Sequence, residues 1–397
     1  MVTTARVRHF LFAPTSRRWI SGCYRTTIAT KDQFGPRTVV PLVRRYHATV
    51  WPSYGITTPV PDHQSPSFAF SPFRFETGYA VCAKRPPRPF PPPFLSPPSS
   101  SFSDPLTTHS LNKDKRLSVE GELIRGLSNG DDAIIASEYL LGVDDGVGAW
   151  ATRPRGHAGL WSRLLLHFWA LEVERRVSAT TSIPDPVECL QLAYEQTTRA
   201  TTSPGEWFGT TTSATALLHW TSELDGTKSP LLYVTNLGDC KILVIRPSKK
   251  EVLFRTSEQW HWFDCPMQLG TNSNDTPCKD AVLSRVSLKE DDIVLAVSDG
   301  VTDNLWEHEI LQLVLDSLQK WDQGHSDIKT LDIPPDMSND RMVYVARELL
   351  NAALIIARDP YAESPYMEKA VDEGLAIEGG KMDDISVVIA LCKKRGV

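Results

Sequence analysis

Apolar residues recur with a helical period in four stretches of the chain. From residue 159 to 177, Leu160, Leu164, Leu165 and Phe168 fall on one stripe, which is the pattern of a helix with a single core-facing side. The other stretches with helical spacing are 185–200, 308–321 and 342–359. The pattern therefore predicts one pair of helices in the first half of the chain and a second pair near its end.

Around these helix pairs, short apolar runs separated by polar turns predict β-strands. The stretch 133–143 has the pattern of a buried hairpin. The other predicted strands are 73–84, 214–220, 230–239, 241–246, 251–256, 292–299 and 385–394. A block of strands flanked by helix pairs favours antiparallel sheets covered by helices over a doubly wound parallel sheet. We therefore predict an α+β fold.

The pattern also divides the chain into a leader and one domain. Residues 1–65 show no periodicity and are predicted to be a leader and linker, and residues 66–397 to form a single domain. A proline-rich insertion at about 85–110 suits neither a helix nor a central strand. We expect this insertion to be an extended, mobile spacer exposed to solvent.

The charge is distributed unevenly along the 397 residues. The net charge is −6, but the first hundred residues contain 13 lysines and arginines against three acidic residues, which leaves −16 for the remainder. A start that is rich in arginine, serine and threonine and poor in acidic residues is typical of a mitochondrial transit peptide. A basic arm that binds nucleic acid and a tail without function are the alternatives. We predict import into mitochondria, to the matrix.

Seven cysteines are scattered along the chain and form no CxxC pair, which argues against a disulfide framework and against a zinc site. A reducing compartment such as the mitochondrial matrix fits this usage. The sequence contains no run of about 18 apolar residues, so we expect no transmembrane segment.

Acidic residues recur where predicted strands begin or end. They are Asp131-Asp132, Asp144-Asp145, Asp239, Asp299 and Asp383-Asp384, each with a glycine within three residues. A single Asp-Gly pair is more often a simple turn. Five such corners meeting at one edge of the sheets would repel one another unless cations lay between them. An oxygen-only ligand set favours Mg²⁺ or Mn²⁺, so the sequence predicts a divalent-cation site.

Six short motifs follow one another in an order that resembles the metal-dependent protein phosphatases of the PPM, or type 2C, family. They are GDDA (130–133), VDDGVG (143–148), SATA (213–216), NLGDCK (236–241), SDGVTDN (298–304) and GGKMDDISVV (379–388). The resemblance covers about residue 73 to the C-terminus. It implies an α-β-β-α sandwich of two antiparallel sheets flanked by helix pairs. The DGVG sequence and the segment 258–269 resemble the mitochondrial, fungal-type branch of the family, which is similar to azacytidine-resistance protein.

The resemblance also implies roles for individual residues. Asp145 would bridge two Mg²⁺ or Mn²⁺ ions, and water activated between the ions would attack the phosphate ester without a protein nucleophile. The implied metal ligands are Asp145, the carbonyl of Gly146, Asp299, Asp383, Asp132, Asp131 through water, and Asp239 for a weaker third ion.

Three positions differ from the family pattern. Val147 stands where most members have a histidine that protonates the leaving group; bound water or His261 could replace that histidine, although packing is the commoner role for such a residue. The family's phosphate-binding arginine has no obvious counterpart, and Arg125 is the nearest candidate for substrate binding. Asp144 falls where relatives usually have alanine, so we expect a supporting or solvent-facing charge.

Together these features predict a mitochondrial phosphatase that hydrolyses phosphoserine and phosphothreonine in proteins. The alternative is a protein of the same fold that binds or regulates partners with little catalytic activity. A two-metal nuclease is disfavoured, because nucleic acid requires a basic groove and the chain after residue 100 carries −16. The resemblance implies phosphoprotein partners among mitochondrial metabolic enzymes, including those of coenzyme Q biosynthesis, and no nucleic acid partner.

Overall fold

The computed structural model describes residues 71–94, 117–179, 184–202, 205–222, 225–324 and 340–395. The predicted leader of residues 1–65 lies outside the described residues, as does the second part of the proline-rich insertion. In the described part of the chain, no helix is long and apolar enough to cross a membrane.

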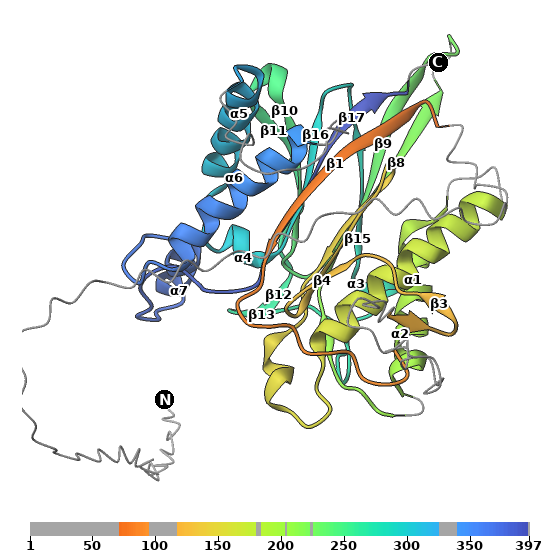
Figure 1. Cartoon of the computed structure of the whole chain (residues 1–397), viewed down its shortest axis with the longest axis vertical. Helices are drawn as coiled ribbons and strands as arrows, with labels where there is room; N and C mark the ends of the chain where they lie inside the picture. Colours follow the sequence, from red (N-terminus) through yellow and green to blue (C-terminus); the bar gives the residue numbers. More distant parts are fainter. Residues whose placement is uncertain are drawn as a thin grey trace, which may run out of the picture. The chain divides into compact units, whose positions relative to one another are not determined.

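The first sheet has five antiparallel strands, in the order β1-β17-β16-β10-β11. They are β1 (Phe73–Cys82), β17 (Ile385–Lys394), β16 (Ile293–Val297), β10 (Lys241–Arg246) and β11 (Glu251–Arg255). Figure 1 shows β1 running beside β17, although the two strands are about 300 residues apart in the sequence. The register pairs Cys82 with Ile385, so the end of β1 lies next to the start of β17.

The second sheet has six antiparallel strands, in the order β15-β9-β8-β6-β5-β4. They are β15 (Val282–Ser287), β9 (Lys228–Leu237), β8 (Ser213–Ser222), β6 (Leu140–Asp144), β5 (Asp132–Ala136) and β4 (Leu127–Asn129). The predicted hairpin is β5 and β6. The edge strands β4 and β15 were not predicted, since β4 has three residues and most of β15 is at least partly exposed.

Two helix pairs cover the sheets on opposite sides (Figure 1). The helices α1 (Ala158–Ala179) and α2 (Pro186–Thr202) pack on the second sheet, and α5 (Glu307–Asp322) and α6 (Asp340–Ala357) on the first. Asp185 caps α2, because its carboxylate accepts hydrogen bonds from the N–H groups of Val187 and Glu188. The expectation of antiparallel sheets covered by helices is therefore confirmed.

Shorter elements complete the described residues. The remaining strands are β2 (Ser118–Val119), β3 (Glu122–Leu123), β7 (Thr210–Thr211), β12 (Trp260–Trp262), β13 (Cys265–Pro266) and β14 (Leu269–Gly270). The remaining helices are η2 (Gly148–Thr152), η3 (Pro247–Lys249), α3 (Pro277–Asp280), α4 (Asp299–Thr302) and α7 (Pro365–Asp372).

Strand β17 shows why the core has three layers of apolar side chains. Ile385, Val387 and Ile389 join the cluster between the first sheet and α5 and α6, whereas Val388 and Ala390 join the cluster between the two sheets. Side chains alternate between the faces of a strand, so a strand buried on both faces must be apolar at every position. Burying β17 in this way brings its N-terminal end, with Asp383 and Asp384, to the junction of the sheets.

The proline-rich segment differs from the solvent-exposed spacer that we predicted, at least in its first ten residues. Phe90 is 7% and Phe94 is 1% exposed, and both belong to the cluster around α1. This packing also changes the expectation for α1, which is buried on every side from Ala158 to Val173 rather than along one stripe. The physical reason is that α1 packs not only on the second sheet but also with α2, Phe90, Phe94 and residues after Leu117, all in one apolar cluster.

Candidate active site

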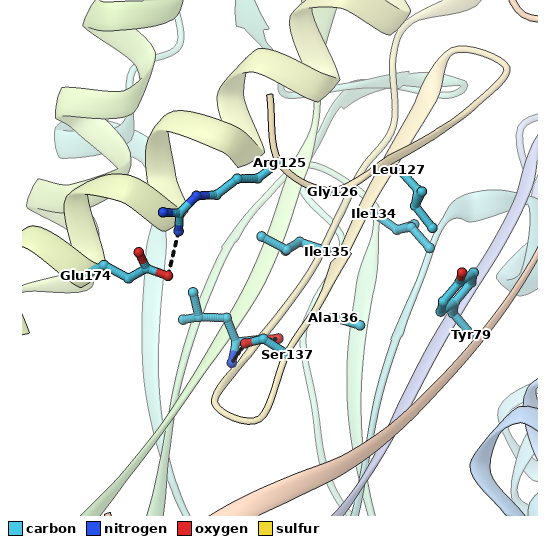
Figure 2. Close-up of a pocket in the computed structure, with 10 residues that line it drawn as sticks. Tyr79, Arg125, Gly126, Leu127, Ile134, Ile135, Ala136, Ser137 and Glu174 are labelled. Carbon is cyan, nitrogen blue, oxygen red and sulfur yellow. Dashed lines mark hydrogen bonds and ion pairs between the residues drawn. The ribbon is translucent and has the colours of Figure 1, made fainter. Parts of the chain in front are cut away.

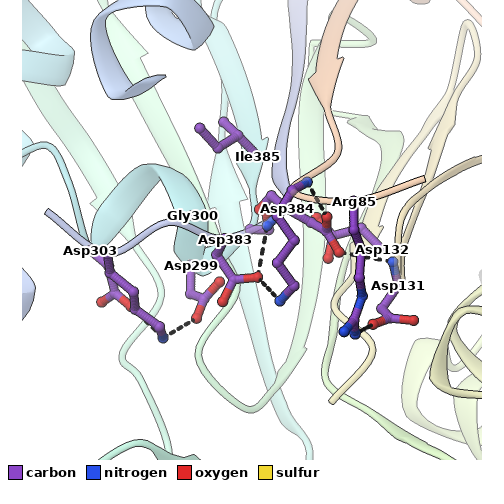
Figure 3. Close-up of polar contacts among 12 residues, drawn as sticks. Arg85, Asp131, Asp132, Asp299, Gly300, Asp303, Asp383, Asp384 and Ile385 are labelled. Carbon is purple, nitrogen blue, oxygen red and sulfur yellow. Dashed lines mark hydrogen bonds and ion pairs between the residues drawn. The ribbon is translucent and has the colours of Figure 1, made fainter. Parts of the chain in front are cut away.

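The structure brings the strand-end carboxylates together where the two sheets meet. A cavity of about 220 Å³ is lined by Asp145, Asp239, Asp299 and Asp383. Asp145 follows β6, Asp239 follows β9, Asp299 follows β16 and Asp383 precedes β17. Asp132 is also buried, and besides this burial the charges of Asp383 and Asp299 raise its pKa, so it lies close to them. We call these five residues the acid centre; Figure 3 shows part of it.

Two lysine ammonium groups lie among these carboxylates, and the sequence did not predict them. Lys84 pairs with Asp383. Lys381 Nζ lies 2.8 Å from Oδ2 of Asp299 and 2.8 Å from Oδ2 of Asp303. Both lysines line the cavity. The protein therefore neutralises part of the negative charge of the acid centre with its own cations.

Asp384 connects three segments of the chain at the acid centre. Its carboxylate accepts a hydrogen bond of 2.7 Å from the backbone N–H of Lys84 and one of 2.8 Å from that of Asp131. Figure 3 shows Asp384 between the segment after β1 and the turn before β5. With both oxygens engaged by backbone donors, Asp384 positions the neighbouring residues, whereas Asp383 faces the cavity.

Two glycines allow these segments to approach one another. Gly130 has a φ of +64°, and a side chain there would collide with the carboxylate of Asp384. A Cβ on Gly146 would collide with the backbone oxygen of Asp131. Glycine is therefore required at both corners, as the Asp-Gly pattern suggested.

Several carboxylate oxygens of the acid centre have no hydrogen-bond partner in the described part of the chain. They are Oδ1 of Asp132, Oδ1 of Asp239 and Oδ1 of Asp299, all buried. A buried anionic oxygen without a partner is unfavourable, and a hard divalent cation is the partner that an all-oxygen set prefers. The donor set therefore fits Mg²⁺ or Mn²⁺. Among the described residues, however, no group of three or more His, Cys, Asp or Glu side chains is arranged so that it could hold a metal ion as they stand.

The protonation of these carboxylates reflects their burial and their repulsion. Burial and neighbouring aspartates raise the pKa values of Asp132, Asp145 and Asp239 well above the usual range. Burial and Asp299 raise the pKa of Asp383 to about 6. Burial acts in the same direction on Asp299, but Lys381 and a hydrogen bond with Asp145 outweigh it and lower the pKa to about 2. Binding of a cation would therefore release protons from several of these groups.

Asp144 is buried, so the solvent-facing alternative of the two that the sequence left open is wrong. Its side chain is 0% exposed. Asp144 is the last residue of β6 and shares a strand face with Leu140 and Gly142, where a Cβ on Gly142 would meet Leu166 of α1. Alternation along the strand therefore directs Asp144 toward the helix layer and Asp145 toward the cavity.

Val147 lines the cavity together with Gly148 and Ala149. Its backbone N–H donates a hydrogen bond of 2.9 Å to the carbonyl of Thr210. The residue thus supplies a small apolar wall where most of the family has a histidine, and the residues that line the cavity include no histidine.

Arg125 does not reach the acid centre. Its guanidinium lies 2.5 Å from Oε1 of Glu174 on α1. Figure 2 shows this pair beside a different pocket, of about 420 Å³, that Ile134, Ile135 and other apolar residues line. Arg125 is therefore not placed to bind a phosphate in the acid cavity.

His261 also lies outside the acid cavity. Its Nε2 is 2.8 Å from Oδ2 of Asp275, and it lines a separate pocket with Trp262 and Trp150. The same Asp275 oxygen accepts a hydrogen bond of 2.9 Å from the backbone N–H of Gln268. His261 thus helps to fix the segment around β12 and β13, and it is not placed to transfer a proton in the acid cavity.

The cations that the structure does place at the site are Lys84, Arg85 and Lys381. Arg85 lies 2.5 Å from Oδ2 of Asp131. The signals for them are the Lys84-Arg85 pair at the end of the first predicted strand and the lysine two residues before Asp383. Neither signal indicates a site until the pairing of β1 with β17 is known.

Comparison with known proteins places the chain in a family. No family model matches the sequence. The protein phosphatase PTC7 homolog of Xenopus laevis is 30% identical over 308 residues, which cover 74% of this chain and 90% of that protein. The probable protein phosphatase 2C 1 of Oryza sativa subsp. japonica is 30% identical over 297 residues, which cover 72% of this chain and 75% of that protein.

A solved structure agrees with this relationship. The photosystem II phosphatase PBCP has a TM-score of 0.50 and 26% sequence identity, covering 67% of this chain and 93% of that one. Both the sequence relatives and this structure are phosphatases, and the aspartates shared with the motifs of the PPM family converge on one cavity. The chain belongs to the PPM, or type 2C, family of protein serine/threonine phosphatases.

Proposed function

We propose that this protein hydrolyses phosphoserine and phosphothreonine in mitochondrial proteins at the acid centre, with two divalent cations. The observation that carries the proposal is the convergence of Asp145, Asp299 and Asp383, from three separate segments, on one cavity. Family membership supports the reaction class, and the buried oxygens without partners support the cations.

The residues that would hold the cations come from both sheets. Asp145 would bridge them with help from the Gly146 carbonyl, and Asp299 and Asp383 would bind the first. Asp132 and Asp131 would serve the second, and Asp239 a weaker third. When bound, two Mg²⁺ or Mn²⁺ ions supply an acidified water and neutralise phosphoryl oxygens.

The chain's own residues contribute charge, shape and position. The ammonium groups of Lys84 and Lys381 face the cavity and can donate hydrogen bonds to phosphoryl oxygens. Val147, Gly148 and Ala149 are small residues in the lining of the cavity, so they occupy little of the space that a phosphorylated side chain needs. Because the lining includes no histidine, we assign the proton for the leaving alkoxide to water.

The reaction is tested by phosphate release from a phosphothreonine peptide with purified full-length protein. We expect activity with Mn²⁺ or Mg²⁺ and none in EDTA. Asp299→Asn should lower kcat at least about 100-fold, because a ligand that stabilises transition-state charge is lost. The matched control is Asp225→Asn, an exposed aspartate in the turn between β8 and β9.

Two outcomes would contradict this function. Equal activity in EDTA would exclude the proposed use of cations. Binding of Mn²⁺ in calorimetry without turnover of any phosphopeptide would favour a regulatory or binding protein of the same fold.

The proposed mitochondrial localisation rests on the basic, acid-poor composition of residues 1–65. The test compares the full chain with a variant lacking residues 1–65, both tagged at the C-terminus, by cell fractionation. We expect the full chain in the mitochondrial matrix fraction and the shortened chain in the cytosol. Cytosolic recovery of the full chain would overturn the assignment.

A further inference from the structure

A second cavity, of about 410 Å³, opens beside the acid centre. Its lining includes Arg85, Arg88, Asp131, Ala151 and Gly156. Asp131 is also near the acid cavity, because a Cβ on Gly148, which lines that cavity, would lie 4.0 Å from Oδ2 of Asp131. The carboxylate of Asp131 is already paired with Arg85 at 2.5 Å. The second cavity is therefore next to the place where a phosphorylated side chain would bind.

Two arginines, Arg85 and Arg88, line this second cavity, and two more lie on the loop that contributes Ala151 and Gly156 to its wall. Arg85 has a side chain that is 45% exposed. Arg88 donates hydrogen bonds to the carbonyls of Gly156 and Ala151, which ties it to the loop on the opposite wall. On that loop Arg153 and Arg155 are exposed, next to Gly156, and a Cβ on Gly156 would touch the Cβ of Arg153. We call these four residues the arginine rim.

Few acidic groups oppose the arginine rim. Arg153 and Arg155 form no ion pair with any carboxylate in the part of the chain that the structure describes. Glu206 is exposed two residues before Phe208, which forms a strand bridge with Gly156. Among the described residues it forms no ion pair with Arg153 or Arg155. The rim thus presents positive charge in a chain whose residues 101–397 carry a net charge of −16.

The backbone holds Arg85 and Arg88 in place. Both lie in the sequence Arg85-Pro86-Pro87-Arg88-Pro89, where proline fixes φ and limits the conformations of the preceding residue. Phe90 and Phe94 anchor the same segment in the core. Little conformational entropy is then lost when a ligand binds, so that charge on this segment contributes more to affinity.

The 3-10 helix η2 links the two cavities. Gly148 and Ala149 line the acid cavity, and Ala151 lines the second one. A peptide whose phosphorylated residue enters the acid cavity and whose chain follows η2 brings its neighbouring residues toward the arginine rim.

We propose that the arginine rim binds aspartate or glutamate residues next to the phosphorylated residue, so that the preferred substrates are phosphoproteins with acidic flanking sequences. This inference rests on the proposed phosphatase function. Carboxylates are the planar anions that guanidinium groups bind with paired hydrogen bonds. Each exposed pair is weak, so several together should change kcat/KM by about tenfold.

The test measures kcat/KM of the full-length protein, with Mn²⁺, for three phosphothreonine peptides that differ only in their flanking residues, which are glutamate, glutamine or lysine. We expect kcat/KM for the glutamate peptide to be about ten times that for the glutamine peptide. For the lysine peptide we expect kcat/KM below that for the glutamine peptide. High salt should bring the ratios toward one, because exposed charges are screened.

The variant Arg153→Glu/Arg155→Glu tests the residues themselves. Arg85 and Arg88 are left unchanged, because they also contact Asp131 and the loop carbonyls. We expect the ratio of glutamate to glutamine peptide to fall to about one or lower, and Arg153→Gln/Arg155→Gln to give an intermediate value. The matched control is Lys320→Glu, an exposed cation on α5 in the opposite helix layer, which should keep the wild-type ratio.

The outcomes separate this inference from the proposed function. If the wild-type protein hydrolyses neither the peptides nor 4-nitrophenyl phosphate, the phosphatase function fails and the inference fails with it. If it hydrolyses all three peptides equally well, or if the charge-reversed variant keeps the acidic preference, the phosphatase function stands and the arginine rim has no role in recognition.

Discussion

At the scale of single residues, Asp144 shows how a strand end can bury a carboxylate. In the part of the chain that the structure describes, neither of its oxygens has a hydrogen-bond partner. Burial raises the pKa of Asp144 well above its usual range, and the nearby Ser213 hydroxyl opposes this only in part. The group is thus protonated in the folded protein at a pH where it is ionised in the unfolded chain.

The raised pKa predicts how the stability of Asp144→Ala depends on pH. A carboxyl group whose pKa is higher in the folded protein stabilises the fold at pH values below its pKa in the unfolded chain, about 3.9. This contribution is lost as the pH rises through its pKa in the folded protein. We expect Asp144→Ala to gain about 1–2 kcal/mol in the free energy of unfolding at pH 7 relative to wild type, and less at pH 4. Urea unfolding at both pH values measures this; an equal difference at each pH would contradict it.

Lys381 gives a second prediction at this scale. Its ammonium group pairs with Asp299 and Asp303, and removal of one partner of a buried ion pair leaves an uncompensated charge. We expect Lys381→Met to lower the free energy of unfolding in EDTA by about 3–5 kcal/mol, and Mn²⁺ to restore part of the loss. Thermal unfolding with and without Mn²⁺ measures both effects. Lys320→Met, on the surface of α5, should change neither the free energy of unfolding in EDTA nor its response to Mn²⁺.

At the scale of elements, the patterned helices and strands could be predicted from the sequence because their apolar spacing is long and regular. The edge strands β4 and β15 could not, since they bury few side chains. The segment 85–94 was misjudged for a different reason. Prolines exclude a helix and a central strand, but they do not prevent Phe90 and Phe94 from packing in a core.

This packing predicts that the proline-rich segment contributes to stability. Phe94 is 1% exposed, and replacing a buried phenylalanine with alanine removes apolar contacts and leaves a cavity. We expect Phe94→Ala to lower the free energy of unfolding by about 3–4 kcal/mol in urea titrations. Tyr361→Ala, at a residue that is 84% exposed, should have little effect. A loss as small as that of the control would mean that the segment is not part of the folded core.

The candidate site was predictable only in part, for a related reason. Asp-Gly pairs at strand ends are local signals, so the aspartates could be identified one by one. The positions of Lys84 and Asp384 depend instead on the pairing of β1 with β17, which no local pattern encodes. Arg125 was a reasonable candidate by its distance in sequence from Asp131, but Glu174 on α1 holds it elsewhere.

At the scale of the whole molecule, the acid centre joins the two sheets. Asp132 lies in, and Asp145 directly follows, a strand of the second sheet, whereas Asp299 and Asp383 lie next to strands of the first sheet. A cation bound between them would therefore stabilise the domain as a unit. At free Mn²⁺ about 100-fold above its Kd, linkage predicts a gain of about 2.7 kcal/mol.

Calorimetric unfolding with Mn²⁺ and with EDTA measures this gain as a rise in Tm. Asp299→Asn should abolish most of the rise, whereas Asp225→Asn, in an exposed turn, should keep it. An unchanged Tm in wild-type protein at saturating Mn²⁺ would show that the cation does not connect the sheets.

The hydrogen bond from Lys84 to Asp384 also has a consequence for how the protein is made. It joins residues 300 positions apart, and β17, which follows Asp384, lies between β1 and β16 in the first sheet. A ribosome-bound chain that ends before residue 383 lacks an inner strand and two carboxylates of the site. The complete site can therefore form only after β17 has been synthesised, and a shorter nascent chain cannot act on phosphoproteins.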